Sequence, residues 1–405
     1  MIARMNIAII TASGFSVPSA VSNRLNAYGR GLNELGNQVT IITLTDCQTN
    51  LRSIAAEYPS INYVGLGDRR RKHRICRIYS SYLAGRAAAR WISLQSENRP
   101  DAVIYYGMLM PARIPISKIC EKLSIPTFDE ITEYPFVGRQ KKWRRRLEYY
   151  LFMQKYLGKN SGILCISNGI IDFIEDSLRQ QNRNIPIMLF GLIVETDKFA
   201  CQNEENKNLP SFWVDHPYIV YCGNMYGNKD GVPDLIKSFA LANEMHPDLH
   251  LVIIGDNSNV SRMAHINAAM DGLSCKTNIH FTGRVEWSTL HAYMCNALAL
   301  VLAKPKNIQN EGAFPTKLGE YLACGKPVIC TSVGDIPLYL QHNENALLAE
   351  PGNTSQFAEQ ICRCVEEAQL RVHLAKNALL LAESEFSHKR QAEKLQTFIL
   401  HIINL

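Results

Sequence analysis

Apolar residues along this chain fall into short runs, separated by stretches in which they recur at helical spacing. The first run, residues 6–10, precedes a stretch from residue 21 to 35 whose apolar residues lie three and four positions apart. The run predicts a buried strand, and the spacing predicts an amphipathic helix. Gly36 ends this helix, and a second apolar run follows at residues 39–43. This strand–helix–strand opening predicts a parallel sheet with right-handed crossovers.

The same alternation recurs along the rest of the chain. Further apolar runs predict strands at residues 102–105, 162–166, 185–189, 218–221, 251–254, 279–281, 297–302 and 328–330, and helices dominate from about residue 355. The polar segment 201–209 predicts a linker. We therefore expect an α/β protein with two Rossmann-like, doubly wound domains, residues 1–200 and 201–387, that face one another across a cleft. Such folds bind ligands outside the carboxyl ends of their strands.

Composition supports a globular chain of two domains, because 405 residues exceed one ordinary core and 46% of them are hydrophobic. The first apolar run is too short for a signal peptide, and no run approaches the roughly 18 residues that would span a bilayer. The twelve cysteines show neither Cys-x-x-Cys pairs nor histidine spacing suited to zinc. This pattern favours buried free thiols in a reducing cytoplasm, without a disulfide framework and without a metal site.

The segment 310–334 carries the strongest signal for chemistry. Pro315 is suited to open a helix, and Gly325 with Pro327 ends it before the predicted strand 328–330. The amino end of such a helix attracts phosphate through its free amide groups and its dipole. Lys317 and Glu320 stand near the first turn, where both side chains can reach the same ligand.

This segment resembles glycosyltransferase family 4, a retaining group with the GT-B architecture. The family pattern Pro-x-Lys-Leu-x-Glu-Tyr-x-Ala-x-Gly-Lys-Pro-Val is met by Pro315, Lys317, Leu318, Glu320, Tyr321, Ala323, Gly325, Lys326, Pro327 and Val328. The resemblance implies a nucleotide-sugar site that includes Pro315, Thr316, Lys317, Leu318 and Glu320.

Two glutamates seven residues apart are usual in that family, and the second accepts hydrogen bonds from the ribose. Glu320 matches the second glutamate. Gly312 occupies the position of the first, and Glu311 stands one residue away. Either Glu311 serves the donor sugar through a one-residue bulge, or the first acid is absent.

The loop 223–231, GNMYGNKDG, offers a second anion site between a predicted strand and a predicted helix. Glycines such as Gly223 let the backbone approach a phosphate, and a lysine neutralises its charge. The resemblance implies that Lys229 holds the leaving diphosphate. Asn224 replaces the arginine of the family, so Lys317 and Arg284 are the candidates for the second cation. The alternative for this loop is a surface turn rich in Asn and Gly.

The first half of the chain carries weaker signals. Gly14, with Ser13 and Ser16 beside it, lies in the first strand-to-helix loop, which in the family approaches the donor diphosphate and the acceptor. Glu133, in the acidic segment 128–135, is the candidate for contact with the acceptor. The alternative for the segment around Gly14 is an ordinary strand–helix connection. The alternative for the segment 128–135 is a solvated loop.

A basic and then aromatic stretch, residues 138–156, has the composition of a helix that lies on an anionic membrane. The alternative is a helix of the first domain with a solvated basic start and a buried aromatic face. No nucleic-acid motif accompanies the basic residues, so we expect no nucleic-acid partner.

The resemblance implies a retaining glycosyltransferase that moves a sugar from a UDP- or GDP-sugar to a hydroxyl acceptor, in bacterial surface polysaccharide or glycolipid biosynthesis. Lys229, Glu320 and Glu311 are its candidate catalytic residues, without cofactor or metal. Residues 388–405 are expected to cross back onto the first domain. The alternatives are a nucleotide-sugar epimerase or phosphorylase of the same architecture and a non-catalytic nucleotide-sugar-binding protein. A dinucleotide-dependent oxidoreductase is disfavoured, because no Gly-x-Gly-x-x-Gly follows the first strand.

Overall fold

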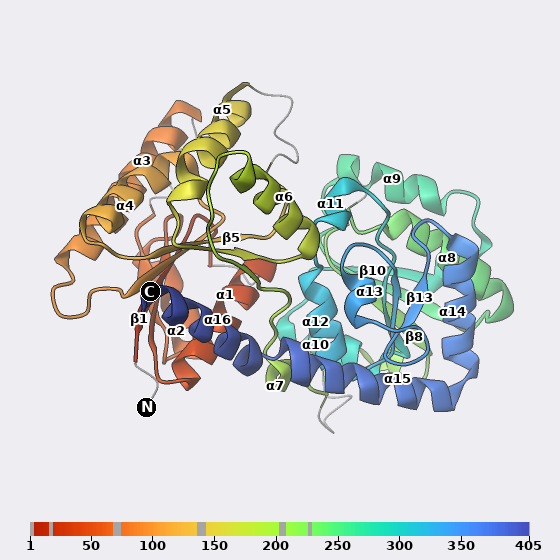
Figure 1. Ribbon diagram of the computed structural model, residues 1–405. Coiled ribbons are helices and arrows are strands. Elements are labelled where there is room, and N and C mark those ends of the chain that lie inside the picture. The colour runs from red at the N-terminus through yellow and green to blue at the C-terminus, as the bar shows by residue number, and fades with distance from the viewer. Residues whose placement is uncertain are drawn as a thin grey trace. The chain divides into compact units, whose positions relative to one another are not determined.

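The computed structural model describes residues 4–15, 19–67, 74–135, 143–201, 208–225 and 229–404. The chain divides into two compact units (Figure 1). The first comprises Met1–Ile193 and His388–Leu405, and the second comprises Val194–Ser387. Each unit is built on one parallel sheet covered by helices. The predicted α/β class is therefore confirmed.

The first unit contains a parallel sheet in the order β3-β2-β1-β4-β5-β6-β7. Its strands are β1 (Asn6–Thr11), β2 (Gln38–Thr43), β3 (Asn62–Gly65), β4 (Ala102–Tyr106), β5 (Thr127–Ile131), β6 (Gly162–Cys165) and β7 (Ile187–Leu189). Its helices are α1 (Ala20–Glu34), α2 (Arg52–Glu57), α3 (Arg74–Leu94), α4 (Met110–Lys122), α5 (Trp143–Leu151), α6 (Asn168–Arg179) and α16 (His388–Ile403). Short helical turns lie at η1 (Gln48–Leu51), η2 (Phe152–Tyr156) and η3 (Leu157–Lys159).

Strand β1 is buried on both faces, which explains its uninterrupted apolar run. Ile7 and Ile9 pack with residues of α1 and α16, and Ala8 and Ile10 pack with residues of α3 and α4. Gly31 of α1 permits the close approach of α16, because a Cβ atom there would lie 2.4 Å from the carbonyl oxygen of His388.

The second unit contains a parallel sheet in the order β10-β9-β8-β11-β12-β13. Its strands are β8 (Tyr218–Cys222), β9 (His250–Ile254), β10 (Ile279–Gly283), β11 (Ala299–Leu302), β12 (Val328–Thr331) and β13 (Leu347–Ala349). Its helices are α7 (Thr196–Phe199), α8 (Val232–Met245), α9 (Val260–Met270), α10 (Trp287–Asn296), α11 (Ile308–Glu311), α12 (Thr316–Ala323), α13 (Ile336–Tyr339), α14 (Thr354–Glu366) and α15 (Ala368–Leu381). Short turns lie at η4 (Ser211–Val214), η5 (Ser274–Asn278) and η6 (Ala382–Phe386).

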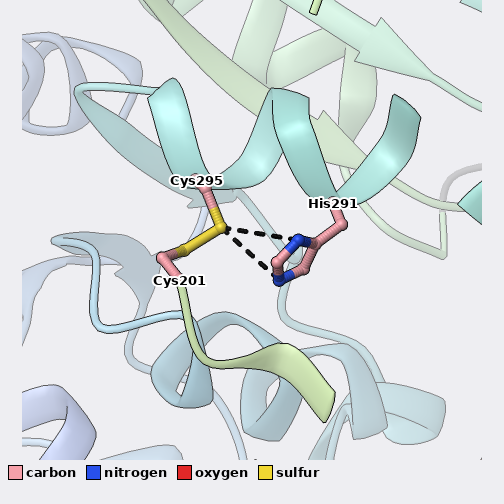
Figure 2. A group of neighbouring side chains, drawn as sticks. All are labelled: Cys201, His291 and Cys295. Carbon is pink, nitrogen blue, oxygen red and sulfur yellow. Dashed lines mark hydrogen bonds between the residues drawn. A yellow bond between two sulfur atoms is a disulfide. The ribbon is translucent and has the colours of Figure 1, made fainter. Parts of the chain in front are cut away.

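The expectation that the cysteines are free thiols is wrong for one pair. Cys201 and Cys295 form a disulfide within the second unit (Figure 2). The pair is 94 positions apart in sequence, so no local spacing marked it. The other cysteines with described side chains are free, and most are buried.

No helix among the described residues combines the length and the apolar character that crossing a membrane requires.

Candidate active site

The strand order of the second unit defines one place where the connections diverge. From β8 the chain runs outward through β9 to β10, and from β11 it runs the other way through β12 to β13. The neighbouring strands β8 and β11 therefore flank a topological switch point, and such sheets bind ligands outside the carboxyl ends of the strands there. The loops that follow these two strands carry a cluster of charged side chains.

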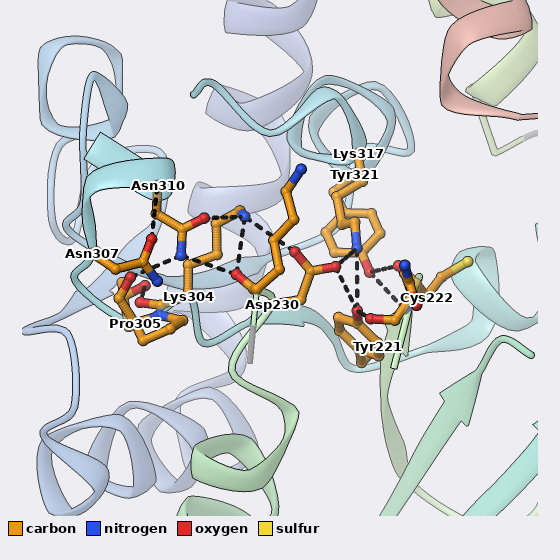
Figure 3. Close-up of polar contacts among 12 residues, drawn as sticks. Tyr221, Cys222, Asp230, Lys304, Pro305, Asn307, Asn310, Lys317 and Tyr321 are labelled. Atoms are coloured by element: carbon orange, nitrogen blue, oxygen red, sulfur yellow. Dashed lines mark hydrogen bonds and ion pairs between the residues drawn. The ribbon is translucent and has the colours of Figure 1, made fainter. Parts of the chain in front are cut away.

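Asp230 lies at the centre of this cluster, between two lysines (Figure 3). Its Oδ2 accepts a hydrogen bond from Nζ of Lys317 at 2.7 Å, and its Oδ1 accepts one from Nζ of Lys304 at 3.1 Å. The hydroxyl of Tyr221 lies 2.8 Å from Oδ2. Two ammonium groups thus share one carboxylate, and the cluster keeps an excess positive charge.

The charges of this cluster act on one another. Burial works to raise the pKa of Asp230, but the ammonium groups of Lys317 and Lys304 outweigh it and hold that pKa well below its ordinary range. Burial lowers the pKa of Lys304, and Asp230 opposes that effect. Asp230 is therefore a carboxylate across the physiological pH range.

Lys304 also fixes the backbone of the loop after β8. Its Nζ donates to Oδ1 of Asn310 at 2.9 Å and lies 3.4 Å from the carbonyl oxygen of Lys229. The side-chain amide nitrogen of Asn310, Nδ2, donates to that same carbonyl oxygen at 2.9 Å. The loops after β8 and β11 are joined through these contacts at Lys229.

Lys317 is the more accessible of the two lysines, with 18% of its side chain exposed against 3% for Lys304. Its Nζ lies over the ring of Tyr221, 4.7 Å from the centroid. A Cβ atom at Gly223 would lie 1.9 Å from this ammonium group, so any larger residue there would displace the Lys317 side chain. Gly231, with φ of +67°, leaves no room either, since a Cβ atom would lie 1.7 Å from the carbonyl oxygen of Ala303.

Helix α12 presents its first turn to the end of β8. Pro315 is its N-cap residue, and the hydroxyl of Tyr321 accepts a hydrogen bond from the backbone nitrogen of Cys222 at 2.7 Å. Burial raises the pKa of the Cys222 thiol to about 12, with Lys317 lowering it and Glu320 raising it, so both charges lie near this strand end. Within α12, the side chain of Leu318 is buried and that of Thr316 is half-buried.

The structure brings only part of the predicted set together. Gly223 and Lys317 are in contact, and the backbone of Lys229 belongs to the same network. Asn224 is exposed, and its backbone carbonyl oxygen accepts a hydrogen bond from the Tyr221 hydroxyl.

Arg284 and Glu311 lie outside the cluster. Arg284 follows β10, two strands from β8, and its exposed guanidinium pairs with Asp256 at 3.5 Å. Glu311 ends α11, and its carboxylate lies 3.9 Å from Nζ of Lys306. Among the described residues, Lys317 and Lys304, rather than Arg284, thus contact the loop after β8 through their ammonium groups.

The first unit holds the remaining predicted residues. Gly14 follows β1, and its loop is fixed by buried Asp46, whose carboxylate accepts a hydrogen bond from the backbone nitrogen of Phe15. Ser16 lies outside the described residues. Glu133 follows β5 and is exposed.

The other two acids of the segment around Glu133 are buried in ion pairs. Glu130 pairs with Arg24, and Asp129 pairs with Arg113. Both acids therefore lie inside the first unit, and the interpretation of this segment as a solvated loop is wrong for them.

Sequence reasoning missed Asp230, Lys304 and Asn310. Asp230 follows Lys229 directly in the predicted anion loop, and Lys304 comes two residues after the buried strand β11. A charged residue within two positions of the end of a buried parallel strand is a usable signal, because strands next to the switch point end at the same edge of the sheet. What the sequence lacked was the strand order that makes β8 and β11 neighbours.

The comparisons with known proteins bear on this same region. Residues 216–367 match the family model described as "Glycosyl transferases group 1". This part of the chain is similar to a group 1 glycosyl transferase domain. All residues of the Asp230 cluster lie within it.

Two curated relatives and one solved structure agree with this assignment. An uncharacterized glycosyltransferase of Methanocaldococcus jannaschii is 22% identical over 278 residues, 66% of each chain. A GDP-mannose-dependent monoacylated α-(1-6)-phosphatidylinositol monomannoside mannosyltransferase of Corynebacterium glutamicum is 22% identical over 215 residues, 51% of this chain and 54% of its own. These matches thus span two thirds or less of the relatives' own length.

The structure of HepE from Anabaena in complex with UDP-glucose superposes with a TM-score of 0.72 at 12% identity, covering 98% of this chain and 100% of HepE. This likeness shows the GT-B fold. The resemblance to a GT-B glycosyltransferase is confirmed at the level of group 1, and membership of family 4 stays a prediction.

Proposed function

We propose that the chain is a retaining glycosyltransferase that moves a sugar from a nucleoside diphosphate sugar to a hydroxyl acceptor. The observation that carries this proposal is the lysine cluster around Asp230 at the switch point of the second sheet. Its excess positive charge suits a diphosphate, which prefers charge-assisted hydrogen bonds. The match to the group 1 family model covers the same residues.

The chemistry follows from where charge develops. As the sugar leaves, negative charge grows on the diphosphate oxygens, and preorganised cations stabilise that charge without reorganisation. Lys317, Lys229 and the first-turn amides of α12 would supply this stabilisation. Asp230 and Lys304 would act as positioning residues, because they hold the Lys317 ammonium and the Lys229 backbone. These lysines supply the positive charge, so we propose a reaction without cofactor or metal.

The course of transfer is proposed from the resemblance. The acceptor hydroxyl would attack from the face that the diphosphate leaves, and a leaving phosphate oxygen would take its proton. Glu320 would bind the ribose, and Glu311 remains the candidate for the donor sugar. Gly14 and Glu133 of the first unit are proposed to contact donor and acceptor.

The donor is proposed to be a UDP- or GDP-sugar. HepE was solved with UDP-glucose, and the Corynebacterium relative is named for its use of GDP-mannose. A thermal-shift screen with both nucleotides and their sugar conjugates would separate the two bases.

The acceptor is proposed to be a glycan or glycolipid of the bacterial surface, reached at the inner face of the membrane. Trp143, Leu147 and Tyr150 of α5 form an exposed stripe, with 73%, 47% and 56% of each residue accessible. Arg145 and Arg146 lie on the same helix, and residues 138–142 are outside the described part. The alternative of a buried aromatic face therefore fails for Trp143 and Tyr150. Aromatic and basic residues together favour anionic membrane surfaces.

Liposome flotation tests this surface. Vesicles containing anionic lipid should carry the wild type, and replacing Trp143 and Leu147 by Ser should reduce the floated fraction several-fold. Leu94→Ser, at an exposed leucine of α3, is the matched control. Flotation that is absent in the wild type, or unchanged in the double variant, would remove the membrane contact from the proposal.

A non-catalytic nucleotide-sugar-binding protein is the second candidate. Asn224 and Gly312 favour it, because they stand where the family has a cation and an acid. An epimerase or phosphorylase of the same architecture is the third. Release of free nucleotide only with an acceptor present supports transfer, release of an isomerised sugar without acceptor supports the epimerase, and binding without turnover supports the binding protein.

Transfer should depend on Lys229. We expect Lys229→Ala to lower the transfer rate about 100-fold or more, the usual cost of losing one preorganised donor. Lys237→Ala, at an exposed lysine of α8, is the control for loss of charge. Wild-type transfer by the Lys229 variant would exclude this lysine from the mechanism.

A further inference from the structure

A second cluster of reactive side chains lies away from the lysine cluster, where α7 and α10 meet. Cys201 follows α7, and His291 and Cys295 stand one turn apart on α10 (Figure 2). The ligand atoms of the three side chains lie within 4.8 Å of one another. We propose that the reduced chain binds one zinc ion at this place and that formation of the Cys201–Cys295 disulfide excludes the ion.

The set of ligands suits zinc. Zinc prefers thiolate and imidazole ligands in tetrahedral geometry, with Zn–S of about 2.3 Å and Zn–N of about 2.05 Å, which places S and N about 3.6 Å apart. Sγ of Cys295 lies 3.9 Å from Nδ1 of His291 and 3.5 Å from Nε2. His291 and Cys295 are four positions apart on one face of α10, as are the two histidines of the His-Glu-x-x-His zinc motif.

His291 is already oriented as zinc-binding histidines are. Its Nε2 lies 3.1 Å from the carbonyl oxygen of Phe199 in α7, so a proton on Nε2 donates to that oxygen. Zinc-binding imidazoles commonly donate their other N–H to a backbone carbonyl, which fixes the tautomer. The lone pair of Nδ1 is thereby left for the metal.

The Cα atoms of Cys201 and Cys295 are 5.4 Å apart. Rotation of the two side chains can separate the sulfurs once their bond is broken, without displacing α10. Among the described residues three side chains supply ligands, so the fourth position is left to water, as in sites with three protein ligands.

The disulfide form and the dithiol form of Cys201 and Cys295 differ by two electrons and two protons. A dithiol reductant transfers two electrons and two protons to the disulfide, which yields two thiols and an oxidised reductant. Zinc then displaces both thiol protons, because thiolates are the binding form. Oxidation reverses these steps and releases the ion.

Cobalt substitution tests the proposal on the full chain. The protein is reduced with a phosphine, freed of metal and reductant, and titrated with Co²⁺, whose thiolate charge-transfer and tetrahedral d–d bands report the site. We expect one Co²⁺ per reduced chain, displaced by Zn²⁺, and no such bands from the oxidised chain. This comparison needs no substitution, so it stands even where a variant fails to fold.

Variants then assign the ligands. Cys201→Ser and Cys295→Ser should lose the bands, and His291→Ala should weaken cobalt binding at least about tenfold. Cys362→Ser and His373→Ala, at a cysteine and a histidine elsewhere in the unit, should bind as the wild type does. The proposal is overturned if the reduced wild type gives no tetrahedral bands at one equivalent, or if the two serine variants give the same bands.

Discussion

At the scale of single residues, the candidate site depends on Asp230. This one carboxylate pairs with two lysines and accepts a hydrogen bond from the hydroxyl of Tyr221. Only 8% of its side chain is exposed. A carboxylate so placed gives Lys317 a defined position, because its Nζ contacts Asp230, the Tyr221 hydroxyl and the Tyr221 ring.

Removing this carboxylate charge should destabilise the second unit. Asp230→Asn leaves the buried Lys304 without its ion-pair partner, and breaking a buried pair costs about 3–5 kcal/mol of unfolding free energy. Urea denaturation measures the loss, and Asp271→Asn, at an exposed acid after α9, is the control. Equal stability of the two variants would show that the Asp230 pairs contribute nothing to the fold.

The sequence indicated some of these residues and not others, for a physical reason. Lys317 and Gly223 were predicted because phosphate chemistry needs a cation and a close backbone, and both belong to recognisable local patterns. Asp230 and Lys304 were not predicted, because their roles exist only once β8 and β11 lie side by side. Likewise Asp129 and Glu130 looked like solvent-facing acids until Arg113 and Arg24, distant in sequence, paired with them.

At the scale of elements, the amino ends of β9 and β10 carry a histidine cluster opposite the candidate site. Nδ1 of His250 lies 3.0 Å from Nε2 of His280, and the ring of His216 lies 5.5 Å from that of His250. Burial lowers the pKa of both His250 and His280, and for His250 the neighbouring histidines lower it further, against Asp248.

The stability of the second unit should therefore fall in mild acid. An unfolded histidine titrates near pH 6.5, whereas these two titrate lower in the fold, so the unfolded chain binds more protons between those values. Above about pH 6.5 both histidines are neutral in the folded chain and their contribution to the free energy of unfolding is fully present. That contribution is lost as the pH falls below this value. We expect the melting temperature to fall less between pH 7 and pH 5 in His280→Gln than in wild type. His401→Gln, at an exposed histidine of α16, should follow the wild type. Identical pH profiles of all three proteins would contradict this account.

The sequence predicted elements best where apolar patterns were long and both sides of a strand were buried. The strands β1, β8 and β12 match their predicted runs within one residue at each end. β3, β5 and β13 lie outside the predicted runs. β3 and β13 are edge strands of four and three residues with a short apolar signal, and the buried acids Asp129 and Glu130 interrupt the apolar run of β5. The final helix α16 was expected from the family resemblance, and it packs against α1 within the first unit.

At the scale of the whole molecule, the two units share one architecture and differ in the chemistry of their strand ends. In the first unit the neighbours β1 and β4 flank the switch point, and the loop after β1 is fixed by the carboxylate of Asp46. In the second unit the corresponding place is occupied by lysines. The charge that suits a diphosphate therefore belongs to the unit that matches the group 1 family model.

The central claim is that the lysine cluster at the switch point of the second sheet binds the diphosphate of a nucleotide sugar. Calorimetric titration with UDP and uridine, and with GDP and guanosine, measures the contribution of the diphosphate alone. We expect one diphosphate to bind at least about tenfold more tightly than its nucleoside, and Lys317→Ala to remove most of that difference, since charge-assisted hydrogen bonds contribute about 1.5–3 kcal/mol. Lys276→Ala, at an exposed lysine elsewhere in the unit, should preserve it. Equal binding of nucleotide and nucleoside by the wild type, or an undiminished preference in Lys317→Ala, would contradict the claim.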